Sequence, residues 1–185
     1  MSEHVFFDLR SSVRVAVPLR RETGDYWRHC DREYNPMPTL DVAPAAGRYH
    51  TLGGAPVWYG ADSIEGAWAE YSKHFPIGVL PMRYLAHVHV RDVAVVDLID
   101  QITLDRLGYS RQQLTMSDYR SCQELGELLL GHQRVDGILA PSAAYDSGRV
   151  LILKRQSVID SSCEVIETSR SLHNLSGRGY GRDAA

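Results

Sequence analysis

The 185-residue sequence has no long hydrophobic run, few cysteines and no excess of positive charge. No apolar stretch approaches the roughly 18 residues of a membrane-spanning helix, and the first residues do not resemble a signal peptide, so we expect no membrane association. The net charge of −3 argues against direct binding of nucleic acid, because counterion release needs a basic surface. The three cysteines form no CxxC pair, which is typical of reduced thiols in a cytoplasmic protein.

Common catalytic and metal-binding motifs are also absent. The sequence contains no GxxxxGK[ST] phosphate loop, no GxSxG nucleophile turn and no HExxH zinc motif. His87 and His89 share one face of a predicted strand, with Asp92 and Asp97 nearby. Two histidines without a third ligand at a definable spacing are more typical of solvent-facing side chains than of a metal centre. We therefore predict no metal site and no prosthetic group.

The sequence does have an ordinary globular composition, with 44% hydrophobic and 23% charged residues. Its length suits one domain that buries about 70% of its unfolded surface. After about residue 167 the composition shifts to serine, glycine and arginine, which cannot form a packed core. We predict a single domain over residues 1–168 and a mobile tail over residues 169–185.

Apolar residues alternate in several short segments. This pattern predicts strands at residues 13–17, 57–60, 84–90, 93–98, 137–141 and 150–153. Residues 20–46 are polar and interrupted by prolines, so we expect only a short structured piece around residues 26–28.

Helical spacing of apolar residues occurs in three other segments. The first predicted helix starts at Ile64, with Asp62 or Ser63 as its N-cap and Asp62 in a capping box with Glu65. A weaker helix is predicted over residues 103–114, and a stronger one after Ser117 or Asp118. Helices and strands do not alternate regularly, so we predict an α+β fold, a central sheet of short strands with packed helices.

Four motifs occur along the chain in a fixed order. They are Tyr26-Trp27-Arg28; Gly47-Arg48-Tyr49-His50, followed by Val57-Trp58-Tyr59-Gly60-Ala61-Asp62-Ser63 and a helix with Glu70; Cys122-Gln123-Glu124-Leu125-Gly126; and Asp136-Gly137-Ile138-Leu139-Ala140-Pro141-Ser142-Ala143. Together, over residues 26–155, their order and spacing resemble the RES domain family, which is named for Arg, Glu and Ser.

The resemblance implies a fold like that of the ADP-ribosyltransferases and the function of a bacterial toxin. Family members belong to type II toxin–antitoxin systems and consume NAD⁺ by hydrolysis, by phosphorolysis or by transfer of ADP-ribose to a protein. It also implies a helix-turn-helix antitoxin that blocks the active site with its C-terminal segment, and hence a hetero-oligomer. NAD⁺ would be the substrate and not a bound cofactor.

Cleavage of the nicotinamide–ribose bond passes through an oxocarbenium-like state, which needs a carboxylate near the developing positive charge. Glu70 lies at the edge of the apolar stripe of its helix, so it can border a cleft and stabilise that charge. Arg48 and, less strongly, Arg28 are candidate clamps for the diphosphate, because a guanidinium matches phosphate oxygens in a bidentate way. The alternatives are a solvated glutamate and two surface arginines.

Hydroxyl groups supply the remaining candidates. Tyr59, and less surely Tyr49, could stack on nicotinamide or donate to a ribose hydroxyl, although a strand tyrosine is as often part of the core. Ser142 follows a predicted strand, where its hydroxyl could bond to Glu70 or to a ribose. It would support catalysis and not act as a nucleophile, because no histidine base is placed for it. Ser121 is a weaker candidate for the same role.

Three other functions remain open at this point. A protein ADP-ribosyltransferase would use the same site and differ only in its acceptor. A catalytically inactive module would bind a nucleotide or an antitoxin without turnover. A ribonuclease toxin is disfavoured, because the chain lacks a basic surface with interleaved aromatic residues.

Overall fold

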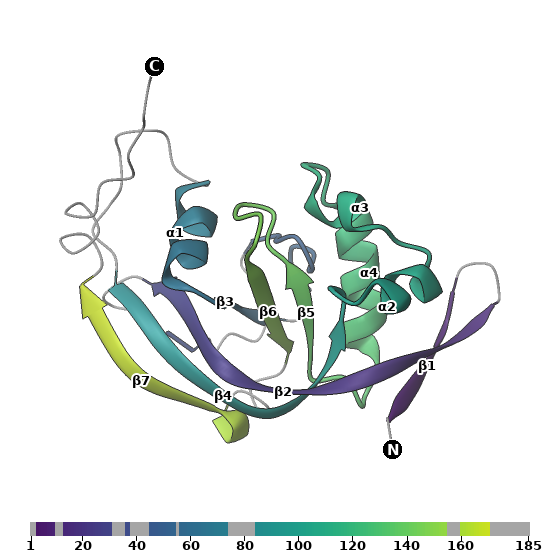
Figure 1. The fold of residues 1–185 in the computed structure, drawn as a ribbon, viewed down its shortest axis with the longest axis horizontal. Coiled ribbons are helices and arrows are strands. Elements are labelled where there is room, and N and C mark those ends of the chain that lie inside the picture. The colour runs from purple at the N-terminus through teal and green to yellow at the C-terminus, as the bar shows by residue number, and fades with distance from the viewer. Residues whose placement is uncertain are drawn as a thin grey trace.

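The computed structural model describes residues 3–9, 13–30, 36–37, 45–54, 56–73, 84–154 and 160–170. They form a seven-stranded mixed sheet with helices at both ends of it (Figure 1). The elements in chain order are β1 (His4–Asp8), β2 (Arg14–Cys30), β3 (Val57–Ala61), α1 (Ile64–Ser72), β4 (Tyr84–Asp97), α2 (Gln101–Leu107), α3 (Arg111–Thr115), α4 (Arg120–Gly131), β5 (Gly137–Pro141), β6 (Arg149–Lys154) and β7 (Cys163–Arg170). The predicted α+β class is confirmed.

The sheet closes on itself around part of the core. The strand order is β1-β2-β3-β6-β5-β4-β7, and β2 also pairs with β4. Five strands, β2, β3, β6, β5 and β4, therefore form a ring in which only β4 and β5 are parallel among the described pairs. β1 and β7 extend this ring at its two edges.

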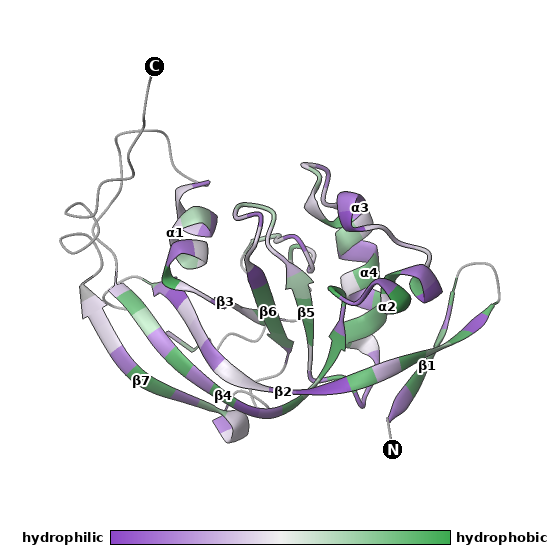
Figure 2. Ribbon diagram, viewed as in Figure 1, coloured by the Kyte–Doolittle hydropathy of each residue, from purple (hydrophilic) through white to green (hydrophobic). Residues whose placement is uncertain are grey.

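Two apolar clusters fill the space on either side of the ring strands. Alternate residues of β5 separate them, because Ile138 packs with the helices α2–α4 while Leu139 packs inside the ring with Trp58 and Tyr26. Every residue of β5 is buried, which explains its unbroken apolar sequence. Figure 2 shows hydrophobic residues along the middle of β5 and β6, with hydrophilic residues at the ends of β6, where Arg149 and Lys154 lie.

The prediction for residues 20–46 was wrong in its first part. β2 is one strand of 17 residues, of which residues 14–18 pair with β1 and residues 19–30 pair with β4. Its polar residues give no alternation of apolar and polar positions, so the sequence pattern did not predict the strand. In the fold these polar residues have hydrogen-bond and ion-pair partners. The buried Glu22 accepts a hydrogen bond from the Tyr26 hydroxyl at 2.8 Å and pairs with Arg20 at 3.0 Å.

The two strands predicted at 84–90 and 93–98 are one strand, β4. The expected turn at Arg91–Asp92 is an irregularity within that strand, where Asp92 has a φ of +51°. The Asp92 backbone N–H donates to the Thr23 hydroxyl of β2 at 2.9 Å. A bulge in a long, twisted strand and a turn between two strands share the same sequence signal.

Helix boundaries also differ from those predicted. Ser63, and not Asp62, caps α1, because its hydroxyl accepts from the Gly66 N–H at 3.0 Å. The single helix predicted over 103–114 is two helices, α2 and α3, separated at Gly108, whose φ of +76° ends α2.

The structure adds two strands that were not predicted, β1 and β7. β7 reaches Arg170, and the rest of the predicted tail lies outside the described residues. No helix within the described ranges is long and apolar enough to cross a membrane.

Candidate active site

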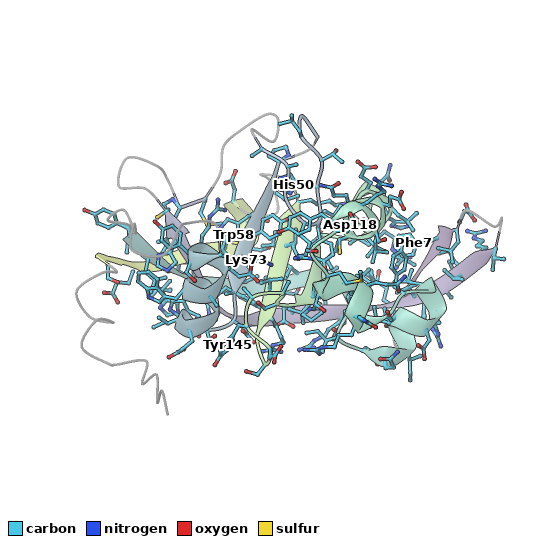
Figure 3. All side chains as sticks on the ribbon, turned by 90° about the horizontal axis from the view of Figure 1, so that it is seen from above. Phe7, His50, Trp58, Lys73, Asp118 and Tyr145 are labelled. Carbon is cyan, nitrogen blue, oxygen red and sulfur yellow. The ribbon has the colours of Figure 1, made fainter. Side chains whose placement is uncertain are left out.

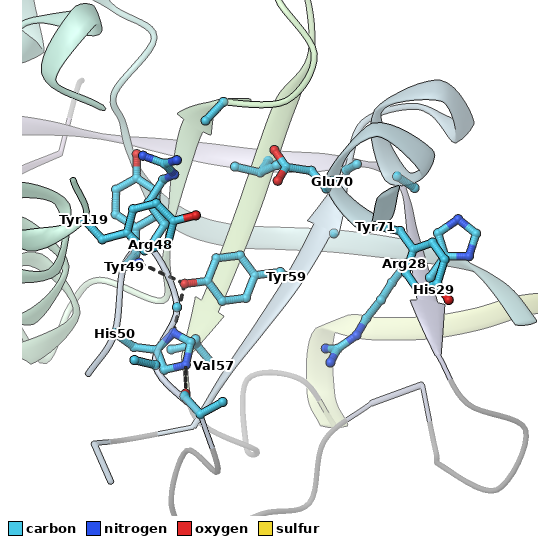
Figure 4. A pocket seen from close by; sticks show the side chains of 18 of the residues that line it. Arg28, His29, Arg48, Tyr49, His50, Val57, Tyr59, Glu70, Tyr71 and Tyr119 are labelled. Atoms are coloured by element: carbon cyan, nitrogen blue, oxygen red, sulfur yellow. Dashed lines mark hydrogen bonds between the residues drawn. The ribbon is translucent and has the colours of Figure 1, made fainter. Parts of the chain in front are cut away.

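A cavity of about 440 Å³ lies between α1, β2, β3 and the segment before α4. Seen from above, His50, which lines the cavity, lies between Trp58 of β3 and Asp118 of the segment before α4 (Figure 3). Ten of the residues that line the cavity are labelled in the close-up (Figure 4), namely Arg28, His29, Arg48, Tyr49, His50, Val57, Tyr59, Glu70, Tyr71 and Tyr119. These ten residues come from five stretches of the chain, at 28–29, 48–50, 57–59, 70–71 and 119, which meet at one site.

The start of α1 is fixed against the sheet, and this positions Glu70. Asp62 pairs with the Arg149 side chain at 2.7 Å and accepts the Arg149 backbone N–H at 2.9 Å. The buried Ala67 packs on Ala61 and Leu85. Glu70 follows Ala67 by three residues, so it lies on the same helix face and reaches the cavity.

Glu70 is held by a serine from another element. The Ser142 hydroxyl, which directly follows β5 and is 3% exposed, donates to Glu70 Oε1 at 2.6 Å. The same oxygen accepts the backbone N–H groups of Ala144 at 3.1 Å and Tyr145 at 3.0 Å. Both backbone groups can only donate, so the single hydroxyl hydrogen of Ser142 goes to the carboxylate. This contact is one of the two that the sequence predicted for Ser142.

The Gly47-Arg48-Tyr49-His50 turn is clamped against α4. The Gly47 N–H donates to the His50 carbonyl at 3.0 Å, and the Gln123 amide of α4 donates to the Gly47 carbonyl at 3.0 Å. A Cβ atom on Gly126 would lie 2.1 Å from the Tyr49 carbonyl oxygen. The turn and the helix approach so closely that glycine is required at this position of α4.

This turn fixes the direction of Arg48. Its Nη1 donates to the carbonyls of Leu114 at 3.1 Å and Met116 at 2.7 Å, and its guanidinium lies 4.3 Å from the centre of the Tyr119 ring. The buried Nη2 has no hydrogen-bond partner among the described residues. Arg48 is thus held in place while one donor remains unused.

Tyr59 is anchored through His50. His50 Nε2 lies 2.9 Å from the Ala45 carbonyl, which can only accept, so this nitrogen carries the proton. His50 Nδ1, 2.9 Å from the Tyr59 hydroxyl, is then the acceptor of the tyrosine hydrogen, and the Tyr59 oxygen accepts the Tyr49 N–H at 3.0 Å. Burial lowers the pKa of His50 and raises that of Tyr59. The hydroxyl hydrogen is therefore already used, and the ring is the part of Tyr59 that is open to a ligand.

Arg28 reaches the cavity from β2. Its Nη1 is buried and has no hydrogen-bond partner among the described residues, and burial lowers the pKa of its guanidinium. A buried guanidinium without a carboxylate is costly. Its neighbour His29 packs on Trp68 and Tyr71 of α1, with ring centroids 4.4 Å and 4.8 Å apart.

The remaining candidates are placed less favourably. The Tyr49 side chain is 1% exposed and belongs to the main apolar cluster, although the residue borders the cavity. Ser121, in the first turn of α4, is not among the residues that line the cavity. Sequence reasoning missed Tyr119 and His29 as lining residues, because neither belongs to a periodic pattern that marks it.

The paired histidines lie elsewhere on the sheet. His87 Nε2 and His89 Nδ1 both contact Asp25 Oδ1, at 3.1 Å and 2.8 Å, and His87 stacks on Trp27. The hydrogen bond from His89 is the largest cause that lowers the pKa of Asp25. Within the described ranges, no group of three or more histidine, cysteine, aspartate or glutamate side chains could hold a metal ion.

Comparisons with known proteins identify relatives. A model of the RES domain matches residues 25–172. A protein of Mycobacterium tuberculosis (strain ATCC 25618 / H37Rv) named "Probable NAD(+) phosphorylase" is 34% identical over 141 residues, which are 74% of this chain and 67% of that protein. Among solved structures, a chain of the M. tuberculosis MbcT–MbcA toxin–antitoxin complex aligns with a TM-score of 0.72 at 17% identity, covering 86% of this chain and 90% of that one. The last likeness shows a shared fold.

Proposed function

We propose that this chain, which belongs to the RES domain family, is a toxin that cleaves the nicotinamide–ribose bond of NAD⁺ with inorganic phosphate as the acceptor. The membership confirms the resemblance found in the sequence motifs. The name of the 34%-identical relative supports phosphate as the acceptor. Water and a protein side chain are the alternative acceptors.

The observation that carries the proposal is the Glu70–Ser142 pair at the cavity edge. Ser142 donates to one carboxylate oxygen, which fixes the orientation of the carboxylate and leaves its other oxygen free for a ribose hydroxyl. As the glycosidic bond breaks, positive charge develops on the ribose ring. A fixed carboxylate stabilises this charge more than it stabilises the ground state, and such differential stabilisation lowers the barrier.

The rest of the cavity suits the other parts of NAD⁺. The Tyr59 ring provides an aromatic wall for the nicotinamide, and Arg28 and Arg48 supply positive charge for phosphate groups. Nicotinamide leaves with the electron pair of its bond to ribose and becomes neutral, so it needs no proton from an acid. This is consistent with a cavity in which Glu70 is the carboxylate among the lining residues.

For the partner, we propose an antitoxin that covers this cavity. The solved chain of similar fold comes from a toxin–antitoxin complex. A helix-turn-helix antitoxin whose C-terminal segment enters the cavity is the arrangement that the family resemblance implies. The same proposal places the toxin in the cytoplasm, where NAD⁺ is available.

Nicotinamide release by the purified chain tests the function. The assay compares reactions with and without inorganic phosphate and separates ADP-ribose 1″-phosphate from ADP-ribose. Glu70→Ala is expected to abolish release, whereas Glu65→Gln, an exposed residue in the first turn of the same helix, serves as the matched control and should retain it.

Each outcome has a definite reading. Nicotinamide release that needs Glu70 and yields ADP-ribose 1″-phosphate supports the proposal. If the product in saturating phosphate is ADP-ribose, the acceptor is water and not phosphate. Labelling of a protein by radiolabelled NAD⁺ would favour the ADP-ribosyltransferase. No release from folded, antitoxin-free protein would refute NAD⁺ cleavage.

A further inference from the structure

Two guanidinium groups line the cavity without a carboxylate partner. Neither Arg28 nor Arg48 forms an ion pair with a described residue, and each has a buried nitrogen, Nη1 and Nη2 respectively, that donates to none of them. Some other arginines do form ion pairs, such as Arg149 with Asp62 at 2.7 Å and Arg20 with Asp97 at 2.8 Å. Two unneutralised cations in one cavity indicate that the ligands bring more than one anionic group.

The two cations occupy different parts of the cavity. In Figure 4, Arg48 and Glu70 lie on one side of the Tyr59 ring, and the guanidinium of Arg28 lies on the other side. Arg48, Glu70 and Arg28 all interact electrostatically with Tyr59, so the Tyr59 ring lies among the three charged groups. One anion bound at Arg28 and another at Arg48 would thus be separated by the aromatic wall.

We propose that these arginines divide the two phosphate ligands of the reaction, with Arg48 binding the attacking inorganic phosphate and Arg28 binding the diphosphate of NAD⁺. The proposal rests on the phosphorolysis proposed above and deepens it. It differs from a common clamp, in which both arginines would hold the diphosphate.

The side of the Tyr59 ring on which Glu70 lies in Figure 4 assigns the acceptor to Arg48. An attacking oxygen must come within about 3–3.5 Å of the ribose C1″ atom, and Glu70 is the carboxylate that stabilises the charge on that ribose. The acceptor site must therefore lie on the Glu70 side of Tyr59, where Arg48 lies.

The fixed geometry of Arg48 fits a small, single anion. Its Nη1 is occupied by the Leu114 and Met116 carbonyls and its plane packs on Tyr119, so Nη2 points in one direction. A donor fixed in this way is pre-organised to bind and orient one phosphate oxygen. Arg28 Nη1 has no hydrogen-bond partner among the described residues, so this end of the guanidinium is available to the oxygens of a diphosphate.

The reaction balances without a further reactant. The bond between C1″ and the nicotinamide nitrogen breaks, and its electron pair neutralises the pyridinium. A phosphate oxygen forms the new bond to C1″, which yields ADP-ribose 1″-phosphate. Hydrogen phosphate already carries a free oxygen, so no base is needed to activate it.

Steady-state kinetics separate the two roles. In Arg48→Lys and Arg48→Gln we expect the KM for phosphate to rise at least about tenfold, as for loss of a hydrogen bond to a charged group. The KM for NAD⁺ should change less than about threefold, and the product should shift towards ADP-ribose. Arg28→Gln should raise the KM for NAD⁺ and leave that for phosphate nearly unchanged, and Arg120→Gln, an exposed arginine at the start of α4, is the control. A rise in the KM for NAD⁺ alone in both Arg48 variants overturns the assignment.

Binding of inorganic phosphate without NAD⁺ provides a second, independent measurement. Phosphate at constant ionic strength should raise the thermal unfolding midpoint of the wild type and of Arg120→Gln, but not that of Arg48→Lys, since a ligand that binds the native state stabilises it. A wild type that is stabilised by phosphate but does not cleave NAD⁺ would refute the proposed function and keep the anion site. A wild type that phosphate does not stabilise, or an Arg48→Lys variant that it stabilises equally, refutes the site.

Discussion

Replacement of Ser142 by alanine tests whether the contact with Glu70 serves catalysis. The change removes a hydroxyl that donates to Glu70 Oε1 at 2.6 Å and accepts two backbone N–H groups. A hydrogen bond to a charged group contributes about 1.5–3 kcal/mol. If the transition state depends on this contact in full, kcat/KM should fall by about 10- to 150-fold, since 1.4 kcal/mol corresponds to a factor of ten.

The same variant should lose some stability. Without the Ser142 oxygen, the N–H groups of Ala144 and Tyr145 lack their acceptor, which costs about 1–3 kcal/mol if no water replaces it. For a chain of this length 1 kcal/mol shifts the unfolding midpoint by about 2–4 °C. We therefore expect a midpoint lower by about 2–12 °C, with cooperative unfolding retained.

The two effects are separated by assaying well below the lowered midpoint. Ser72→Ala is the matched control, because it removes an exposed serine hydroxyl, bonded to the Ala69 carbonyl at 3.2 Å, from the same helix that carries Glu70. This control should stay within about twofold of the wild type. A Ser142→Ala protein with a lowered midpoint and unchanged kcat/KM would show that Ser142 only stabilises the loop, and the reasoning about Glu70 would fail.

Three further predictions concern the same cavity. Glu70→Gln should unfold cooperatively with a midpoint near that of the wild type while cleavage is lost; a large loss of stability by circular dichroism would mean that Glu70 is structural. Protonation of His50 removes the acceptor of the Tyr59 hydrogen, and burial lowers the pKa of His50 in the folded state. The unfolded chain therefore takes up the proton first, so the contribution of His50 to the free energy of unfolding should be full above about pH 6.5 and decline below it. Denaturant titrations of wild type and His50→Asn between pH 5 and 8, roughly the range of histidine titration, should show a larger decline in the wild type, since His132, whose pKa burial also lowers, contributes to both proteins. Arg28→Met should raise the free energy of unfolding by about 1–4 kcal/mol, since it removes an unpaired buried charge, and a urea titration that shows destabilisation instead would identify Arg28 as a structural residue.

The sequence predicted the parts of the fold that depend on local patterns. β3, β5 and β6 are short apolar strands bounded by turns, and their periodicity was sufficient to locate them. β2 could not be located in this way, because its polar residues are satisfied by β4 and by each other. Pairing between distant strands leaves no mark on the sequence of either strand alone.

In the candidate site, too, the sequence predicted the residues that belong to local motifs but not the contacts that depend on the fold. Glu70 and Ser142 were predicted from motifs, and the structure brings them into contact across 72 positions of sequence. The orientation of Arg48 depends on two main-chain carbonyls and on Tyr119. Carbonyl groups have no sequence signature, so which of its nitrogens remains unused could be learned only from the fold.

The contrast between the arginines inside and outside the cavity links the stability of this protein to its function. Arg20 and Arg149 pair with Asp97 and Asp62, so folding neutralises their charge. Arg28 and Arg48 have no anionic partner among the described residues, and the folded protein bears the cost of desolvating them. An anionic ligand removes that cost when it binds, so affinity for phosphate groups and stabilisation by them have one physical origin. Any segment of a partner that seals the cavity must meet the same two cations, and a carboxylate or phosphate-like group is what the site selects.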